Sequence, residues 1–437
     1  MPILRDTNEL NDEPLLLPAA DAVQPEHACQ WWYWSGQLRG EAGGRYGFQA
    51  AFFAAEALRG ALWGQMAHAA IVDLERGRFA SESRLWLGAP RRIEGRFDLG
   101  SRDGALVARG GDGRDRLELR VGELALDLRA VGGPTILHYD GRAHDYSFGG
   151  YTYYYSRPRM AGAGVVRRGG AAEAVRGEVW FDRQYGDLSA ALFEGWQWLS
   201  VHLDDGGTIM VFSFNRAEGE RFAAVVDGAG QARWVGAEGF SLAAIDGWRS
   251  PRSGVEYPCG WRLRIEGHDL VIRASTQAQE MNGPAWVGPV YWEGACEVEG
   301  SHRGVAYVEL LGSMSAGVAE GSAPREDVPG DRRRGRALGR ALGHPVAALG
   351  VATGVGWLAA RVAALRPSFP EGQVVASERR GEARVDGSLI RRLAERAGGR
   401  GSAGATEPGL GAFTMLRLAR GGAGGRFGGA ARRASAG

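Results

Sequence analysis

Lysine is absent from this chain of 437 residues, so all 52 of its basic residues are arginine. We read this as GC-rich coding. The net charge of +1 argues against a dedicated nucleic-acid binder. The charge is unevenly distributed, because residues 321–437 hold 20 arginines against 9 acidic residues. The remainder of the chain is therefore acidic, and the tail is basic.

Cysteine is scarce. The three cysteines are widely separated and lack metal-site spacing: Cys29, Cys259 and Cys296. Three of the histidines also lack carboxylate or cysteine partners at metal spacing: His138, His144 and His202. The chain shows no convincing phosphate loop, dinucleotide fingerprint or nucleophile elbow. We therefore expect a reducing compartment, no disulfide framework, no metal site and no cofactor.

Long apolar runs are also lacking. The most apolar stretch, residues 346–365, is interrupted by Arg361, so its uncharged part is shorter than the roughly 20 residues that a spanning helix needs. Residues 1–6 contain no basic segment followed by an apolar one, which would mark a secretory signal. We expect a cytoplasmic protein.

Short strand patterns, separated by turns rich in glycine and aspartate, fill the chain to about residue 313. Their regular spacing predicts an all-β protein with antiparallel sheets. Residues 195–205 and 208–214 form a predicted hairpin. Each half has an early tryptophan-rich strand, a glycine turn and an aromatic strand, which suggests tandem copies of one architecture.

Aromatic residues are concentrated in residues 30–38. Because successive side chains of a strand alternate between faces, Trp32 and Trp34 should share one face, and Trp31 and Tyr33 the other.

The central segment, residues 177–186, brings an acid, a cation, an amide and a phenol together. It is followed by an aromatic strand that contains Trp196 and Trp198. We interpret this segment as the hinge between the two halves and the floor of a pocket.

Several motifs occur in an order that resembles a known family. They occupy residues 31–38, 46–49, 153–160, 180–186, 195–198 and 291–294. Together they resemble the lipocalin-like family that contains hydroxyneurosporene synthase, also called carotenoid 1,2-hydratase, and its AttH-type relatives. The resemblance covers about residues 25–313. Fungal pericyclases that fold polyene chains are similar in architecture.

The resemblance implies two tandem lipocalin-like antiparallel β-barrels with a shared apolar cavity. We expect an N-terminal arm at residues 1–27, a first barrel at 28–175 and a second barrel at 176–315. Residues 316–437 form an extension rich in arginine, glycine and alanine, which is not part of the family pattern. It is expected to be partly helical or disordered.

The family activity implied by the resemblance is hydration of a terminal double bond of an apolar polyene or isoprenoid. A carboxylic acid in an apolar pocket stays protonated, and aromatic faces stabilise cations. Asp182 is the predicted acid, and Tyr185 and Gln184 are predicted to position water. The predicted substrate-binding residues are aromatic walls, reserve acids and polar groups: Trp32, Trp34, Gln49, His68, Tyr154, Trp196, Trp198, Glu280 and Glu293.

Structural alternatives remain open for several of these residues. Asp182 and Arg183 could form an ion pair that closes the hinge. His68 could be a hydrogen-bonded core residue and not a general base. The run from Tyr153 to Tyr155 could be barrel wall, or it could orient a ligand's polar end.

Two other functions are also compatible with the sequence. One is a non-catalytic carrier that binds a lipid or pigment, because small barrels readily provide such sites. The other is a polyene cyclase, in which the cavity only folds and orients its substrate. Loss of the Asp182 carboxylate should abolish hydration, leave lipid binding intact and only modestly slow a cyclisation.

The basic extension leads to a hypothesis about membranes. Residues 346–365 could be an amphipathic helix on a membrane, a packed helix or part of a poorly ordered tail. We predict that the extension docks the protein on anionic membranes, with about 1 kcal/mol per arginine near the surface. Full-length protein should float with anionic vesicles, and a version that ends near Ser315 should not. Equal flotation of the two would contradict the hypothesis.

Overall fold

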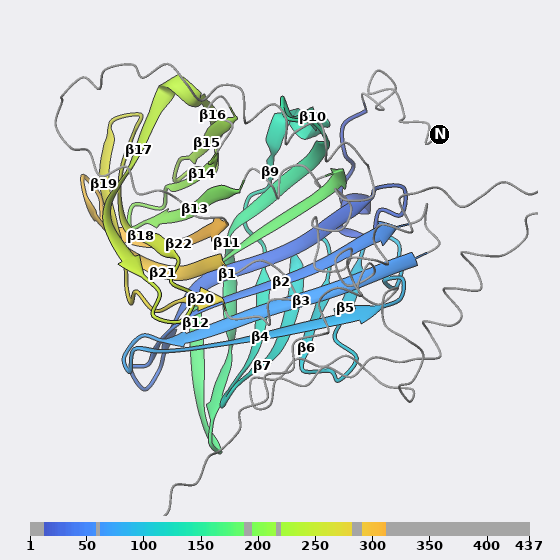
Figure 1. The fold of residues 1–437 in the computed structure, drawn as a ribbon, viewed down its shortest axis with the longest axis horizontal. Helices are drawn as coiled ribbons and strands as arrows, with labels where there is room; N and C mark the ends of the chain where they lie inside the picture. Colours follow the sequence, from blue (N-terminus) through green and yellow to red (C-terminus); the bar gives the residue numbers. More distant parts are fainter. Residues whose placement is uncertain (1–12, 58–61, 188–194, 216–219, 282–290, 312–437) are drawn as a thin grey trace, which may run out of the picture. The chain divides into compact units, whose positions relative to one another are not determined.

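The computed structural model describes residues 13–57, 62–187, 195–215, 220–281 and 291–311 (Figure 1). The expected extension at residues 316–437 and its predicted helix lie outside these residues, as does the start of the N-terminal arm. Within the described part of the chain there are strands and 3-10 turns but no α-helix. It follows that this part contains no helix of the length and apolar character needed to span a membrane.

The first sheet has twelve strands, ordered β4-β3-β2-β1-β12-β11-β8-β7-β6-β5, with β9 and β10 also paired to β11. All of its pairs are antiparallel. Its strands are β1 (Cys29–Gly40), β2 (Arg45–Ala57), β3 (Leu62–Asp73), β4 (Arg78–Leu87), β5 (Phe97–Gly100), β6 (Leu106–Gly110), β7 (Arg114–Val121), β8 (Leu124–Val131), β9 (Ile136–Leu137), β10 (His144–Asp145), β11 (Tyr151–Arg168) and β12 (Ala171–Asp187).

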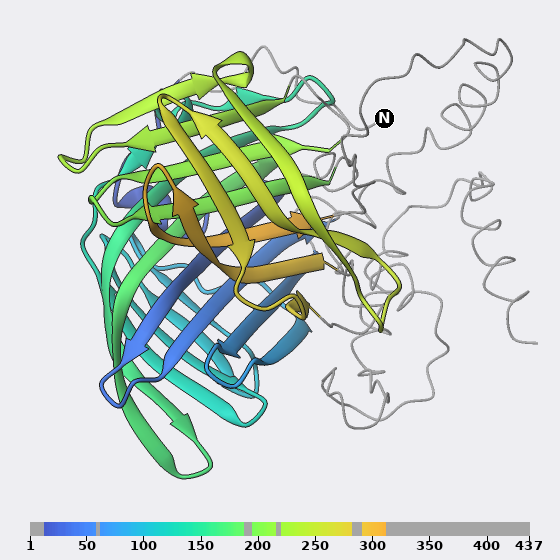
Figure 2. The same ribbon diagram turned by 90° about the vertical axis from the view of Figure 1, so that its left-hand side faces the viewer.

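The second sheet has ten strands, ordered β16-β15-β14-β13-β22-β21-β19-β18-β17, with β20 also paired to β21. Its strands are β13 (Trp196–Leu203), β14 (Thr208–Phe214), β15 (Arg221–Val226), β16 (Ala232–Gly236), β17 (Phe240–Arg249), β18 (Glu256–Ile265), β19 (His268–Ala274), β20 (Glu280–Met281), β21 (Tyr291–Gly300) and β22 (Gly304–Leu311). Both sheets are curled into half-barrels (Figure 2). The predicted all-β architecture and the hairpin β13–β14 are confirmed.

The boundary between the sheets lies later than expected. Residues 175 and 176, where the first barrel was predicted to end, fall inside β12. This strand pairs with β1 on one side and β11 on the other as far as Gly186 and Asp187. The central segment is therefore a middle strand of the first sheet and not a hinge that opens the second, because its register with β1 continues without interruption.

The concave side of the first sheet encloses one apolar core. Its large buried side chains include Trp32, Trp34, Phe48, Phe97 and Phe181. Burial of each such side chain contributes about 1.5–3 kcal/mol. The arm reaches this core, because Trp32 donates to the Asp21 carbonyl at 2.8 Å. The second sheet has its own core, which includes Trp261 and Trp292.

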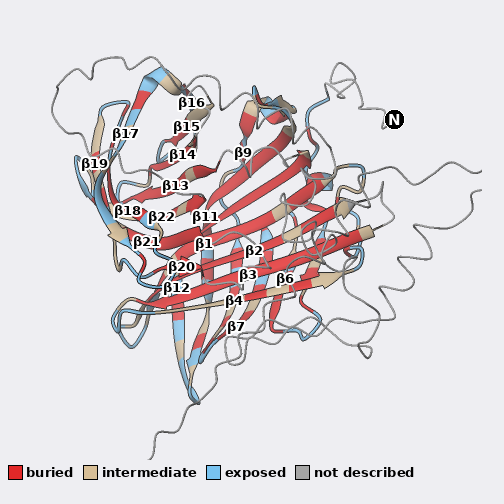
Figure 3. Ribbon diagram, viewed as in Figure 1, coloured by how far each residue is buried: buried red, intermediate tan, exposed pale blue. Residues whose placement is uncertain are grey.

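A third apolar cluster joins the two sheets. Tyr33, Tyr154 and Trp180 of the first sheet contact Trp196 and Trp198 of the second within it. Figure 3 shows that buried residues continue along β1 and β11. We call the region between the facing sheets the seam.

Glycine allows the sheets to approach closely at one end of the seam. A Cβ atom at Gly47 of β2 would lie 2.8 Å from the Cβ of Ala295 on β21 and 2.8 Å from Val72. Such contacts are shorter than van der Waals packing permits, so this position requires the absence of a side chain.

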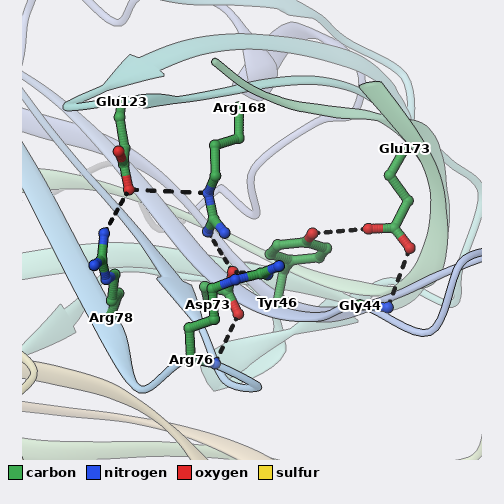
Figure 4. A network of polar contacts seen from close by, with 8 residues as sticks. All are labelled: Gly44, Tyr46, Asp73, Arg76, Arg78, Glu123, Arg168 and Glu173. Carbon is green, nitrogen blue, oxygen red and sulfur yellow. Dashed lines mark hydrogen bonds and ion pairs between the residues drawn. The ribbon is translucent and has the colours of Figure 1, made fainter. Parts of the chain in front are cut away.

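An ionic network joins four hairpin ends of the first sheet (Figure 4). Asp73, at the end of β3, accepts hydrogen bonds from Arg76 at 3.0 Å and from Arg168 of the β11–β12 hairpin. Arg168 also lies 3.9 Å from Glu123, between β7 and β8. Glu173 accepts from Tyr46 at 2.8 Å. The network therefore links strands that are not neighbours in the sheet.

Removal of the central carboxylate should destabilise the protein. Asp73 has a side chain that is 1% exposed, and an Asp73→Asn substitution would leave Arg168 and Arg76 without their anionic partner. We expect a loss of about 1–3 kcal/mol in the free energy of unfolding, measured by urea denaturation. Asp269→Asn is the matched control, because its ion pairs are exposed to solvent and should contribute little to stability. Equal losses in the two variants would contradict this role.

Candidate active site between the two sheets

One row of side chains crosses the seam face of the first sheet. Strand register places His68 opposite Ala51, Ala51 opposite Tyr33, Tyr33 opposite Asp182, and Asp182 opposite Ser156. Directly paired residues point to the same face of a sheet. Five strands, from β3 to β11, therefore contribute one side chain each to this row.

A matching row crosses the second sheet. Phe212 lies opposite Trp198, Trp198 opposite Glu309, and Glu309 opposite Glu293. This row contains two acids on neighbouring strands, next to two aromatic rings.

Hydrogen bonds connect the two rows across the seam. The Tyr33 hydroxyl donates to Oε2 of Glu293 at 3.4 Å. The Trp198 indole donates to the Tyr154 hydroxyl at 3.1 Å. The two rows therefore form one polar cluster within the aromatic seam.

His68 and Tyr291 make a further contact across the seam. The Nδ1 atom of His68 and the Tyr291 hydroxyl share a hydrogen bond of 2.6 Å. Burial lowers the pKa of His68 to about 4. His68 is therefore neutral and only weakly basic at pH 7, and it is a buried, hydrogen-bonded residue.

Asp182 is buried, with 4% of its surface exposed. Its Oδ2 accepts from Tyr154 at 2.8 Å, and its Oδ1 accepts from Trp180 at 2.7 Å and from Ser156. Ser156 in turn shares a hydrogen bond of 2.7 Å with His138. Burial raises the pKa of Asp182 to about 7, although the three donors oppose this shift.

The geometry contradicts an ion pair between Asp182 and Arg183. The two residues are neighbours on β12, so their side chains leave opposite faces of the sheet. The Arg183 guanidinium lies 3.8 Å from the centre of the Trp32 ring and donates to the Ala22 carbonyl at 2.7 Å. Arg183 thus stabilises the first core and the arm, while Asp182 faces the seam.

Glu293 and Glu309 lie opposite each other on β21 and β22, and Glu309 is half-buried. Glu293 is 1% exposed. Burial raises the pKa of Glu309 to about 8, and the nearby Asp182 adds to the shift, whereas a hydrogen bond from Trp196 opposes it. Burial, followed by repulsion from Glu309, raises the pKa of Glu293 well above its usual range. These two acids therefore hold protons at neutral pH.

Most of the other predicted residues also reach the seam. Gln184 lies two residues after Asp182 on β12, so the two side chains point to the same face. Its Nε2 is 3.4 Å from the Thr152 hydroxyl. Gln49 donates to the Met281 sulfur at 3.4 Å. Trp196 stacks on Trp31 with ring centres 6.4 Å apart.

Four predicted site residues lie elsewhere. Trp32, Trp34 and Tyr185 belong to the core of the first sheet, on the opposite face from Asp182. Glu280 accepts a hydrogen bond from Ser250 at 2.8 Å. Its neighbour Met281 belongs to the seam cluster. Because successive side chains of a strand point to opposite faces of the sheet, these residues point away from the seam.

Sequence reasoning missed several seam residues, namely Tyr33, Ser156, Trp180, Tyr291 and Glu309. One signal was available for Glu309. It is an acid in an otherwise apolar strand and shares a face with Tyr307 and Leu311, since alternate residues point the same way.

Metal-binding geometry is not found in the described part of the chain, where no three His, Cys, Asp or Glu side chains are placed to hold an ion. All three cysteines are buried and have free thiols.

Comparisons with known proteins cover both sheets together. A family model described as AttH-like matches residues 8–313. The chain belongs to the AttH-like family. No curated protein matches it.

Two crystal structures share the fold of this AttH-like chain. One is a protein from Nitrosomonas europaea named as an AttH, with 25% identity and a TM-score of 0.63 over 70% of this chain and 99% of that chain. The other is kievitone hydratase from Nectria haematococca, with 17% identity and a TM-score of 0.56 over 70% of this chain and 94% of that chain. The lipocalin-like fold is therefore shared with a hydratase.

The acid pair of Glu293 and Glu309 should make stability depend on pH. The folded state keeps a proton on Glu309 up to about pH 8, whereas the unfolded chain releases it near 4.5. Stability supplied by this residue therefore falls as pH rises through that window, by up to about 1.4 kcal/mol per pH unit. The stability of Glu309→Gln relative to the native protein should increase as the pH is raised from 4.5 to 8, measured by urea titrations. A difference that stays constant with pH would contradict the shift.

Proposed function

We propose that this protein adds water to a carbon–carbon double bond of an apolar isoprenoid or polyene, with the reaction occurring in the seam. The observation that carries the proposal is a set of three acids among aromatic rings, of which Asp182 and Glu293 are buried and Glu309 is half-buried. Membership of the AttH-like family and the fold shared with a hydratase support the same reaction class.

The hydrogen bonds distinguish the roles of the acids. Asp182 accepts from three donors, an environment that favours its carboxylate. Glu309 and Glu293 have fewer donors and repel each other, so they favour the protonated form. We assign Glu309, with Glu293 beside it, as the proton donor and Asp182 as the proton acceptor. This reverses the role predicted for Asp182 from the sequence.

The proposed reaction balances in two steps. The carboxylic acid of Glu309 gives its proton to one alkene carbon, and the π electrons form the new C–H bond. Water then forms a C–O bond to the resulting carbocation and loses a proton to the Asp182 carboxylate. Proton exchange between the acids and solvent restores both groups, and the net change is addition of one water.

Aromatic rings near both acids would stabilise the cation. The ring centres of Tyr33 and Trp198 are 5.4 Å apart in an edge arrangement, and those of Trp180 and Trp198 are 5.7 Å apart. Such rings stabilise positive charge without acting as nucleophiles. An apolar substrate with a terminal double bond, as in carotenoid 1,2-hydration, suits these walls.

The proposal predicts loss of product when either acid is neutralised. A host that makes lycopene or neurosporene, expressing this protein, should accumulate a product heavier by one water, detected by mass spectrometry. Asp182→Asn and Glu309→Gln should each lower the rate by about 10²–10⁴-fold. Glu280→Gln is the matched control. Glu280 is a buried acid of the second sheet, the sheet that also contains Glu309, but it lies off the seam.

The pH dependence of the purified enzyme tests the assigned roles. Activity should rise with pH through about 7 as Asp182 ionises and fall above about 8 as Glu309 loses its proton. If the remaining activity of Glu309→Gln no longer falls above about pH 8, the donor role of Glu309 is supported. Binding of the polyene with no product in any variant would instead favour a carrier, and a cyclised isomer without added water would favour a cyclase.

A further inference from the structure

A cavity of about 330 Å³ opens at a place away from the acid cluster. Its walls come from β1, β2, β11 and β12 of the first sheet and from β13, β21 and β22 of the second. Four arginines line it: Arg39, Arg45, Arg159 and Arg176. Neither the family assignment nor the proposed hydration uses these residues.

Three of the arginines stand in one row. Arg39 of β1 lies directly opposite Arg45 of β2 on one side and Arg176 of β12 on the other. Directly opposed residues have Cβ atoms about 4.5–5.5 Å apart, and like charges in such pairs destabilise a sheet. An anion that binds between the guanidinium groups would reduce this repulsion.

Protein carboxylates neutralise only part of this charge. Arg159 pairs with Glu178 at 2.5 Å, and Arg45 pairs with Glu297 at 2.7 Å and with Glu75 at 3.4 Å. Asp204 is the third acid of the lining. Among the described residues, no ion pair to a carboxylate is found for Arg39 or Arg176, and both are exposed. These two guanidinium groups are therefore available to a ligand.

A buried histidine forms part of the cavity wall. His202 lines the cavity, and its side chain is only 8% exposed. Its Nδ1 lies 3.4 Å from Oε2 of Glu178. Its Nε2 is buried and has no hydrogen-bond partner within the described residues. Because this nitrogen is closed to solvent, His202 belongs to the cavity wall, and its Nε2 does not reach a molecule that binds in the cavity.

We propose that this cavity binds a phosphate group, either as the free ion or as part of a small phosphate ester. Arginine matches phosphate because its planar fork donates two parallel hydrogen bonds to two oxygens. Arg39 and Arg176 hold the anion from neighbouring strands, and Arg45 adds charge from the third. The cavity has room for an organic portion as well as the phosphate.

The cavity is separate from the acid cluster. Trp180 stands between them, since it stacks on His202 with ring centres 6.0 Å apart and donates to Asp182 from its indole nitrogen. Phosphate binding therefore does not depend on the proposed hydration, and either proposal can fail alone.

Calorimetric titration of the full-length protein tests the site. Inorganic phosphate and diphosphate are titrated at constant ionic strength, with chloride as the replaced anion. We expect saturable binding with one site per chain. Arg39→Gln and Arg176→Gln should each weaken it at least tenfold, because each removes a bidentate donor.

The control is Arg129→Gln, which should change the affinity less than twofold. Arg129 is an exposed arginine of β8 that faces Arg116 across the strands, away from the cavity lining. Unchanged thermal unfolding of each variant shows that the fold is kept. Absence of saturable binding to the native protein, equal affinity in Arg176→Gln, or tighter binding of succinate than of phosphate would overturn the proposal.

Discussion

Alternation of side chains along β1 and β12 is the constraint on which the rest of the structure depends. Each of these central strands supplies the first core from one face and the seam from the other. Trp32 and Phe181 therefore fill the core, while Tyr33 and Asp182 face the second sheet. A one-residue shift in register would exchange the two sets and place a carboxylate in the apolar core. Stability and chemistry are thus linked within the same strands.

The cost of burying acids explains why the seam is built from aromatic residues. A buried carboxylate that remained charged would require strong pairing, whereas a protonated one needs only modest hydrogen bonding. The seam supplies hydroxyl and indole donors, such as Tyr154 and Trp180, and no arginine contacts Asp182 among the hydrogen bonds found in the described residues. This environment keeps the pKa values of Asp182 and Glu309 close to 7 and 8. Groups with such values exchange protons readily at neutral pH.

The architecture could be predicted from the sequence because its signals are local. Strand patterns, turns and the order of aromatic motifs require only neighbouring residues, and they predicted an all-β chain with two similar halves. Alternation also predicted that Trp32 and Trp34 share a face opposite Tyr33. The boundary between the sheets depends on pairing between distant strands. Nothing local shows that β12 closes the first sheet against β1 and β11.

The acid site could be predicted only in part, for the same reason. Asp182 and Glu293 were identifiable as acids in apolar surroundings, but which of the two faces meets the other sheet is decided by tertiary packing. That choice removes Trp32, Trp34 and Tyr185 from the site and brings in Tyr33. Glu309 becomes important only because β22 pairs with β21 in the register that sets it opposite Glu293. The two acids share one environment only because of this register. In the sequence alone, each of them is an isolated charged residue in an apolar strand pattern.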